Sequence, residues 1–211
     1  SEYDLAAELQ VSRLTIRKAI DELIKNKILV KRKSKGTYVI SRQKIQSGRG
    51  GLQSFSEAAK FLGKTSITQV VSFEKLQEVP AEVALALEVD HLLSPTIYKL
   101  VRIRSLDADK MTVEKVYIPE QYVKNVSQEE LQNSLFAIIE QQTEIGYSHQ
   151  EIEAALITSE ISELLDIPLG QAVLRAQSTT FSIDAKPILH DISYYRSDKY
   201  SFKNTLVRGQ S

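Results

Sequence analysis

Apolar residues recur at helical spacing between Leu5 and Leu9 and again between Ile16 and Leu23, which predicts two short helices. Ser12 is suited to cap the second helix at its N-terminus. Residues 28–33 and 37–40 have the composition of two strands joined by a glycine-containing turn. The first forty residues are therefore predicted to fold as helix, turn, helix and hairpin.

Beyond residue 51 the pattern changes to helices that alternate with long, strand-like hairpins. The predicted helices span residues 54–63, 80–88, 134–144 and 159–166. The predicted strands span residues 96–106, 111–118, 149–158, 172–182 and 187–195. Consecutive hairpins form an antiparallel sheet, and we expect the helices to cover one of its faces. The predicted fold class is α+β.

Two segments of this second region share one plan. Residues 80–118 and 159–195 both run through a helix, a strand, a turn that contains Asp and Ala, and a second strand. The period is too long and the copies too few for a solenoid. We interpret the two segments as an internal pseudo-repeat.

A polar segment separates the two regions. Residues 43–51 contain Gly48, Gly50 and Gly51 beside basic residues, a composition typical of a flexible linker. We therefore expect a DNA-binding domain at residues 1–42, a linker at 43–51 and a second domain at 52–211.

Composition narrows the class of protein. The chain has 211 residues, 42% of them hydrophobic, and no cysteine, which excludes disulfides and thiolate chemistry and favours a reducing compartment. No apolar run approaches the roughly 20 residues that a membrane helix needs, and the N-terminus lacks a signal-peptide pattern. We expect a cytoplasmic protein without a membrane partner.

The formal net charge of zero conceals an asymmetry. Residues 1–44 hold 11 Lys and Arg against 5 Asp and Glu, so this part carries +6 and the remainder −6. A basic region favours a polyanionic partner, although a solvated basic face is an equally ordinary explanation of charge alone. Arg13, Thr15, Arg17 and Lys18 cluster in the N-terminal half of the second helix, on the face opposite its apolar stripe.

The segment Ser12–Ala19 and the hairpin end Lys35–Val39 resemble the DNA-binding domain of the GntR family of bacterial regulators. The resemblance implies a winged helix-turn-helix whose second helix contacts double-stranded operator DNA and whose wing enters the adjacent minor groove. The residues expected to contact DNA are Ser12, Arg13, Thr15, Arg17, Lys18, Lys35, Gly36 and Thr37.

Two positions depart from the family pattern. Family members have a further helix before the stretch that begins Ser1-Glu2, so the domain is expected to lack its first helix and to expose Leu5 and Ile20. The wing has Ser34 where relatives more often have glycine, which tolerates positive φ better.

Two arginines mark a candidate binding site in the second domain. Arg102 and Arg104 are two residues apart on a predicted strand, so both point to the same face. A phosphate or carboxylate ligand would satisfy both guanidinium groups. Pairing with Glu114 across the hairpin, or simple exposure on the sheet, is the structural alternative.

The order of motifs after residue 52 resembles the UTRA effector domain of the HutC branch of the GntR family, which has a chorismate-lyase-like fold. The motifs are residues 54–57, 100–104, 114–119, 134–136 and 195–200. The resemblance implies a homodimer and a pocket for a small molecule, to which residues 54–56 supply helix N-terminal amides. Relatives often have an acidic residue two positions after a proline, where this chain has Leu189. Asp191 lies on the same strand face as Leu189 and Tyr195 and is expected to take the place of that acid. The residues expected to bind the effector are Ser54, Phe55, Ser56, Arg102, Arg104, Glu114, Ser134, Phe136, Asp191 and Tyr195.

Three functions compete. A transcription repressor controlled by a small anionic metabolite such as a sugar phosphate accounts for both domains. An enzyme that acts on a small carboxylate is the alternative, because the second domain resembles chorismate lyase, although fold analogy is weak evidence for chemistry. A ligand-insensitive architectural DNA binder leaves the second domain unexplained. His91, His149 and His190 lack metal-ligand spacing, and phosphate-loop and dinucleotide motifs are absent, so no metal or cofactor is expected.

Overall fold

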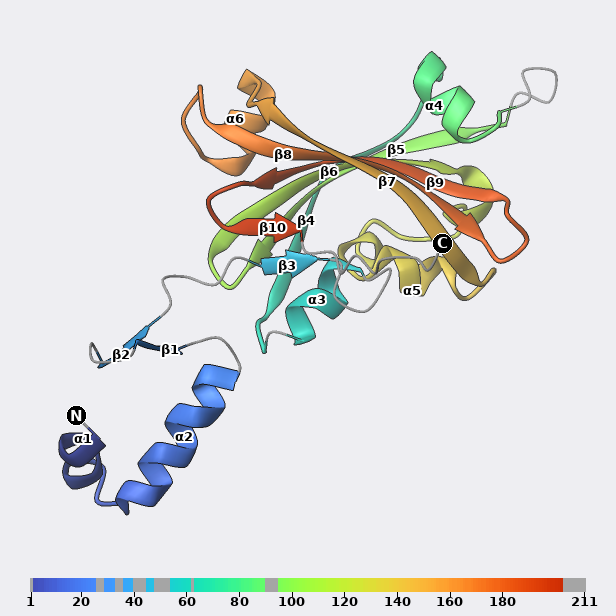
Figure 1. Cartoon of the computed structure of the whole chain (residues 1–211). Helices are drawn as coiled ribbons and strands as arrows, with labels where there is room; N and C mark the ends of the chain where they lie inside the picture. The colour runs from blue at the N-terminus through green and yellow to red at the C-terminus, as the bar shows by residue number, and fades with distance from the viewer. Residues whose placement is uncertain are drawn as a thin grey trace, which may run out of the picture. The chain divides into compact units, whose positions relative to one another are not determined.

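A computed structural model describes residues 2–25, 29–32, 36–39, 45–47, 54–61, 63–89 and 95–202. The chain divides into two compact units, Ser1–Lys44 and Ile45–Ser211 (Figure 1). Helices and antiparallel strands occur in both, so the predicted α+β class is confirmed. Among the described residues, no helix has the length and apolar character needed to cross a membrane.

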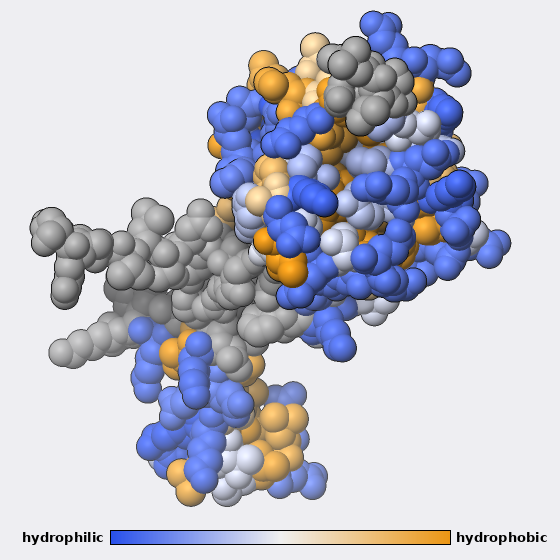
Figure 2. Space-filling model, turned by 90° about the vertical axis from the view of Figure 1, so that its right-hand side faces the viewer, coloured by the Kyte–Doolittle hydropathy of each residue, from blue (hydrophilic) through white to orange (hydrophobic). Residues whose placement is uncertain are grey.

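The first unit consists of two helices and a hairpin, in the predicted order. Helix α1 spans Glu2–Glu8 and α2 spans Arg13–Lys25, and strands β1 (Leu29–Arg32) and β2 (Gly36–Val39) pair antiparallel. In the space-filling view, hydrophilic side chains of this unit gather on one side of the visible face and apolar side chains on the other (Figure 2). Among the described residues of this unit, the exposed large apolar side chains are Tyr3, Leu5, Leu9, Val11 and Leu14.

Leu5 is exposed, as expected, whereas Ile20 is half-buried. In this unit the buried residues of the two helices are Ala6 and Ile16. Ile16 belongs to the apolar stripe predicted for the second helix.

The second unit is built on a six-stranded antiparallel sheet with the order β4-β5-β6-β9-β8-β7. A separate parallel pair joins β3 (Ile45–Ser47) to β10 (Tyr200–Phe202). The sheet strands are β4 (Ser66–Lys75), β5 (Ile97–Leu106), β6 (Asp109–Pro119), β7 (Ile145–Leu156), β8 (Ala172–Ser182) and β9 (Pro187–Arg196).

Helices lie on both faces of this sheet (Figure 1). On one face Val101 and Ile103 pack with residues of α6 (Ser159–Leu165), and α4 (Ala81–Ala86) covers the same face. On the other face Leu100 and Val116 pack with α5 (Leu135–Ile139), and α3 (Phe55–Phe61) lies beside it. Two short 3₁₀ helices complete this layer, Glu120–Tyr122 and Glu130–Gln132. The expectation of one covered face was wrong, because both side-chain rows of β5 are largely buried.

The strand order describes two similar halves. One half runs β4, α4, β5 and β6, the other runs β7, α6, β8 and β9, and β6 pairs with β9 at the centre. This agrees with the pseudo-repeat seen in the sequence.

Three further details differ from the sequence analysis. Strand β4 was not predicted, since it is an edge strand whose residues alternate between half-buried and exposed. The predicted helix 134–144 ends at Ile139, and the strand predicted from His149 begins at Ile145. Residues 45–47, expected in a flexible linker, form β3 because their backbone pairs with β10.

Candidate functional site

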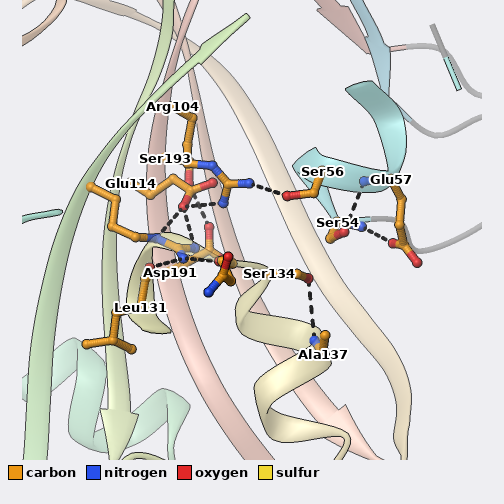
Figure 3. A network of polar contacts seen from close by, with 12 residues as sticks. Ser54, Ser56, Glu57, Arg104, Glu114, Leu131, Ser134, Ala137, Asp191 and Ser193 are labelled. Atoms are coloured by element: carbon orange, nitrogen blue, oxygen red, sulfur yellow. Dashed lines mark hydrogen bonds and ion pairs between the residues drawn. The ribbon is translucent and has the colours of Figure 1, made fainter. Parts of the chain in front are cut away.

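The central feature of the second unit is a buried cluster of charges on the face covered by α3 and α5. Arg102 on β5 lies directly opposite Glu114 on β6, and Arg104 lies two residues further along β5. Arg102 donates to Glu114 Oε2 from Nε at 3.1 Å and from Nη2 at 2.7 Å, and Arg104 Nη1 donates to the same oxygen at 3.4 Å (Figure 3). One carboxylate therefore compensates two guanidinium groups. Burial opposes ionisation of Glu114, but Arg104 and Arg102 outweigh it and hold the pKa of this carboxyl below its usual value.

The two arginines have different partners beyond Glu114. Arg102 Nη1 also donates to the carbonyl oxygens of Leu131 at 3.1 Å and Asn133 at 3.2 Å. These bonds tie β5 to the segment before α5. The pairing with Glu114, considered as the structural alternative from sequence, is therefore present, and Arg102 also connects β5 to this segment.

Arg104 instead reaches toward α3. Its Nη2 donates to Ser56 Oγ at 2.8 Å, and its guanidinium carbon lies 4.7 Å from the centre of the Phe55 ring. Arg104 is 2% exposed, yet its Nε has no hydrogen-bond partner among the described residues. The hydroxyl of Thr112, opposite Arg104 on β6, is likewise buried without a partner there. Buried polar groups normally have a hydrogen-bond partner, so these two are exceptions among the described residues.

Asp191 and Ser193 on β9 complete the cluster on the same face (Figure 3). Ser193 Oγ donates to Asp191 Oδ2 at 2.9 Å. Burial raises the pKa of Asp191 from 3.8 to about 7, and the neighbouring Glu114 carboxylate adds to this shift. With Asp191 protonated below that pH, one carboxylate faces two arginines and the cluster carries a net positive charge.

A cavity of about 440 Å³ adjoins this cluster between the starts of α3, α5 and β7. Four of its lining residues were predicted from sequence, namely Ser54, Ser56, Ser134 and Phe136. Six were not predicted, namely Glu57, Lys60, Ala137, Glu140, Ile145 and Gly146.

The remaining predicted residues lie around the cavity rather than in its lining. Arg104 is connected to the cavity by its hydrogen bond to the lining residue Ser56, and its guanidinium lies over the ring of Phe55. Tyr195 packs against Tyr200 and Phe202, with ring centres 4.4 and 5.1 Å apart, and burial raises the pKa of its hydroxyl well above its usual value.

Local sequence explains how the two helix starts are formed. Ser54 and Glu57 make a capping box, in which the Ser54 amide donates to Glu57 Oε2 at 2.6 Å and the Glu57 amide donates to Ser54 Oγ at 3.3 Å. Ser134 Oγ accepts from the Ala137 amide at the start of α5. The Ser54 amide, predicted to bind an anion, is thus occupied by Glu57.

Gly146 forms part of the cavity wall where β7 begins. A side-chain carbon at this position would lie 2.8 Å from the carbonyl oxygen of Ser182 and 3.0 Å from the amide nitrogen of Ile183. The register of β7 also shifts between Ile145 and Tyr147. An isolated glycine in a strand pattern is the signal by which sequence reasoning could have found this bulge.

In the first unit, Arg13, Thr15, Arg17 and Lys18 lie on the exposed face of α2. Ser12 caps this helix, since its Oγ accepts from the Thr15 amide at 3.1 Å. Arg17 Nη2 lies 3.1 Å from Glu2 Oε2, and the Arg13 guanidinium carbon lies 3.5 Å from the centre of the Tyr3 ring. Lys18 and Thr37 are exposed, Gly36 begins β2, and Lys35 lies outside the described residues.

In the part of the chain that the structure describes, no group of three His, Asp or Glu side chains lies close enough together to hold a metal ion. The basic face of α2 and the cavity beside the buried charge cluster are the two candidate sites.

Comparison with known proteins identifies both units. The gntR family of bacterial regulatory proteins matches residues 1–39, and the UTRA domain family matches residues 62–201. The HTH-type transcriptional regulator TreR of Bacillus subtilis (strain 168) is 32% identical over 212 residues, which cover all of this chain and 88% of TreR. The transcriptional repressor NagR of the same organism is 30% identical and covers 99% of this chain and 85% of its own. The repressor MngR of Escherichia coli (strain K12) is 26% identical, with 96% and 83% covered.

Solved structures show the same fold. PhnF from Mycobacterium smegmatis covers 99% of this chain and 91% of its own with a TM-score of 0.75 at 23% identity. YydK from Bacillus subtilis covers 99% and 88% with a TM-score of 0.65 at 20% identity. The curated relatives are transcriptional regulators, so the enzyme alternative is set aside. The chain belongs to the GntR family, in its HutC type with a UTRA domain, and is a DNA-binding transcriptional regulator.

Proposed function

We propose that this protein is a cytoplasmic repressor whose operator binding is controlled by a small anionic metabolite, held in the cavity between α3, α5 and β7. Arg104 is the observation that carries the proposal. It is buried beside the cavity and donates to the cavity-lining Ser56, and among the residues that the structure describes its Nε has no hydrogen-bond partner. A fixed guanidinium in a low-dielectric site favours an anionic ligand.

The other lining groups support a sugar phosphate as the ligand class. Ser56 and Ser134 offer hydroxyls, and Glu57 and Glu140 offer carboxylates that accept hydrogen bonds from sugar hydroxyls. The names of two relatives, a mannosyl-D-glycerate system repressor and a fructoselysine operon repressor, also refer to sugar derivatives. Amino-acid catabolites and other small acids remain the competing classes.

The test is a ligand screen by isothermal titration calorimetry on the full chain with glucose 6-phosphate, N-acetylglucosamine 6-phosphate, the matching neutral sugars and inorganic phosphate. Each charge-assisted hydrogen bond contributes on the order of 1.5 to 3 kcal/mol, so Arg104→Ala should weaken binding of the best phosphosugar about 10- to 150-fold. Arg175→Ala is the control. Arg175 pairs with Glu153 and lies opposite Tyr194 of β9, which packs on the sheet face away from the cavity, so Arg175 lies on that face too.

Two results would overturn this proposal. One is an effector that proves to be uncharged. The other is an Arg104→Ala protein that responds to the effector as the wild type does.

We also propose that the protein binds a two-fold symmetric operator as a homodimer assembled through residues 52–211. GntR-family regulators bind operator DNA and typically act as dimers. A symmetric dimer presents two recognition helices about one DNA turn apart, so footprinting should reveal paired half-sites. Sedimentation of the full chain at micromolar concentration tests the dimer, and a strictly monomeric species would contradict it.

A further inference from the structure

Arg13 and Arg17 of α2, the helix proposed to bind the operator, contact side chains of different kinds. Both of these side chains come from neighbouring residues of α1, the carboxylate of Glu2 and the ring of Tyr3. Arg17 Nη2 donates to Glu2 Oε2 at 3.1 Å, and the side chains are 56% and 25% exposed. Arg13 stacks on Tyr3 and donates from Nη1 to its hydroxyl at 2.5 Å.

A carboxylate beside Arg17 acts against a phosphate contact. Glu2 offsets part of the guanidinium charge and would itself repel a phosphate brought within hydrogen-bond distance of Arg17. A guanine edge presents the neutral acceptors O6 and N7, which Glu2 does not repel. Because Glu2 occupies one of five guanidinium donors, the remaining donors can bind such an edge in bidentate fashion.

The ring of Tyr3 has the opposite effect on Arg13. An aromatic face orients a guanidinium through cation–π attraction and leaves its full positive charge available. An oriented but uncompensated cation suits the phosphate backbone, which fixes the position of the protein without reading sequence.

We infer that Arg17, backed by Glu2, reads a base edge, most simply guanine, while Arg13, stacked on Tyr3, contacts phosphate. Glu2 is then a specificity-determining residue that does not touch DNA: it orients the reading arginine and lowers affinity for other sequences. The inference rests on the proposed operator binding through α2.

The experiment uses the full chain with an operator selected in vitro from a random duplex library, and with a scrambled duplex of the same length. Binding is measured by fluorescence anisotropy over a range of salt concentrations. Glu2→Gln should raise affinity for the scrambled duplex several-fold at low salt, steepen the salt dependence by about one phosphate per head, and lower the ratio of operator to scrambled affinity. Glu8→Gln is the matched control, because it removes the same charge from an exposed position on the same helix and should leave the ratio unchanged.

Arginine variants give a second readout that does not depend on how well the Glu2 variant folds. Arg17→Ala should lower the operator-to-scrambled ratio about 5- to 150-fold. Arg13→Ala should weaken binding to both duplexes alike and reduce the salt slope by about one.

The outcomes separate the two proposals. A wild type that selects no sequence and binds no duplex refutes operator binding itself. A wild type that selects an operator, but whose ratio is unaffected by Arg17→Ala or changes equally with Glu2→Gln and Glu8→Gln, refutes the inference alone. A ratio that falls with Arg17→Ala and Glu2→Gln but not with Arg13→Ala supports it.

Discussion

Each unit of this protein carries a pair of arginines, and the two pairs lie in opposite environments. Arg13 and Arg17 are on an exposed helix face, and each has its own partner from α1. Arg102 and Arg104 are buried in the sheet domain and share Glu114. Exposed charges are screened by water and salt and contribute little to folding. They can therefore bind a polyanion such as DNA without a large cost in stability. Buried charges are coupled to folding, so a change in their balance alters the stability of the domain.

Removal of the shared carboxylate should have the largest effect. Glu114→Gln removes the carboxylate that both buried guanidinium groups contact, so we expect the free energy of unfolding to fall by about 3 to 5 kcal/mol. Urea denaturation measures this change. Glu160→Gln, which breaks the partly exposed pair with Lys115, is the control and should cost less than about 1 kcal/mol. Equal losses for the two variants would mean that the buried cluster is not stabilised by its charge balance.

Ionisation of Asp191 should have the next largest effect on the free energy of unfolding. Its pKa of about 7 in the folded protein exceeds its unfolded value, so between about pH 4 and 7 the unfolded chain loses this proton while the folded protein keeps it. The stability contribution is therefore present below pH 4 and is lost as pH rises through 7. Asp191→Asn removes this loss and should be more stable than the wild type by about 2 to 4 kcal/mol at pH 8, with little difference at pH 4.

Thermal unfolding of both proteins across this pH range tests the prediction. The stability difference between wild type and variant should grow from pH 4 to pH 7 and then level off. A pH-independent difference would show that Asp191 is ionised in the folded protein throughout.

The helix caps offer a matched pair between the two units. Ser12 caps α2 and Ser54 caps α3 through the same kind of side-chain hydrogen bond. Either Ser→Ala change should cost about 1 kcal/mol, and Ser→Thr should restore most of it. Denaturant titration checks both. A much larger loss for Ser54→Ala would indicate that this hydroxyl does more than cap its helix.

The smallest effect on stability is expected for removal of the Glu2 carboxylate in the first unit. Glu2→Gln breaks one exposed ion pair with Arg17 and should change the free energy of unfolding by less than about 1 kcal/mol. Chemical denaturation of the full chain, followed by circular dichroism, measures it. A loss comparable to that of Glu114→Gln would remove the contrast between the two arginine pairs.

Sequence periodicity was sufficient for elements whose burial is regular. The apolar stripe of α2, the Ser54 cap and the strongly apolar hairpins β5–β6 and β8–β9 were all predicted. Strand β4 was missed because Ile67 and Val71 point to solvent at the sheet edge, so no buried row marks it.

The candidate site was only partly predictable for a related reason. Alternation along β5 places Arg102 and Arg104 on one face, but it does not distinguish their roles. Their difference comes from distant residues, the carbonyl of Leu131 for Arg102 and the hydroxyl of Ser56 for Arg104. Lys60 and Glu140 line the cavity only because α3 and α5 meet in the folded domain.

The strand order β4-β5-β6-β9-β8-β7 also determines the order in which the site assembles during folding. Arg102 and Glu114 lie on one hairpin, whose closure needs only a short turn and is a fast, local event. Pairing of β6 with β9 joins residues such as Thr112 and Tyr195, about eighty positions apart, so its loop-closure entropy is larger and it is expected to be slower. The arginine–carboxylate pair is thus assembled within one half of the sheet, and Asp191 reaches it only when the two halves dock. Ligand-binding competence during refolding should therefore follow the late β6–β9 pairing rather than early hairpin formation.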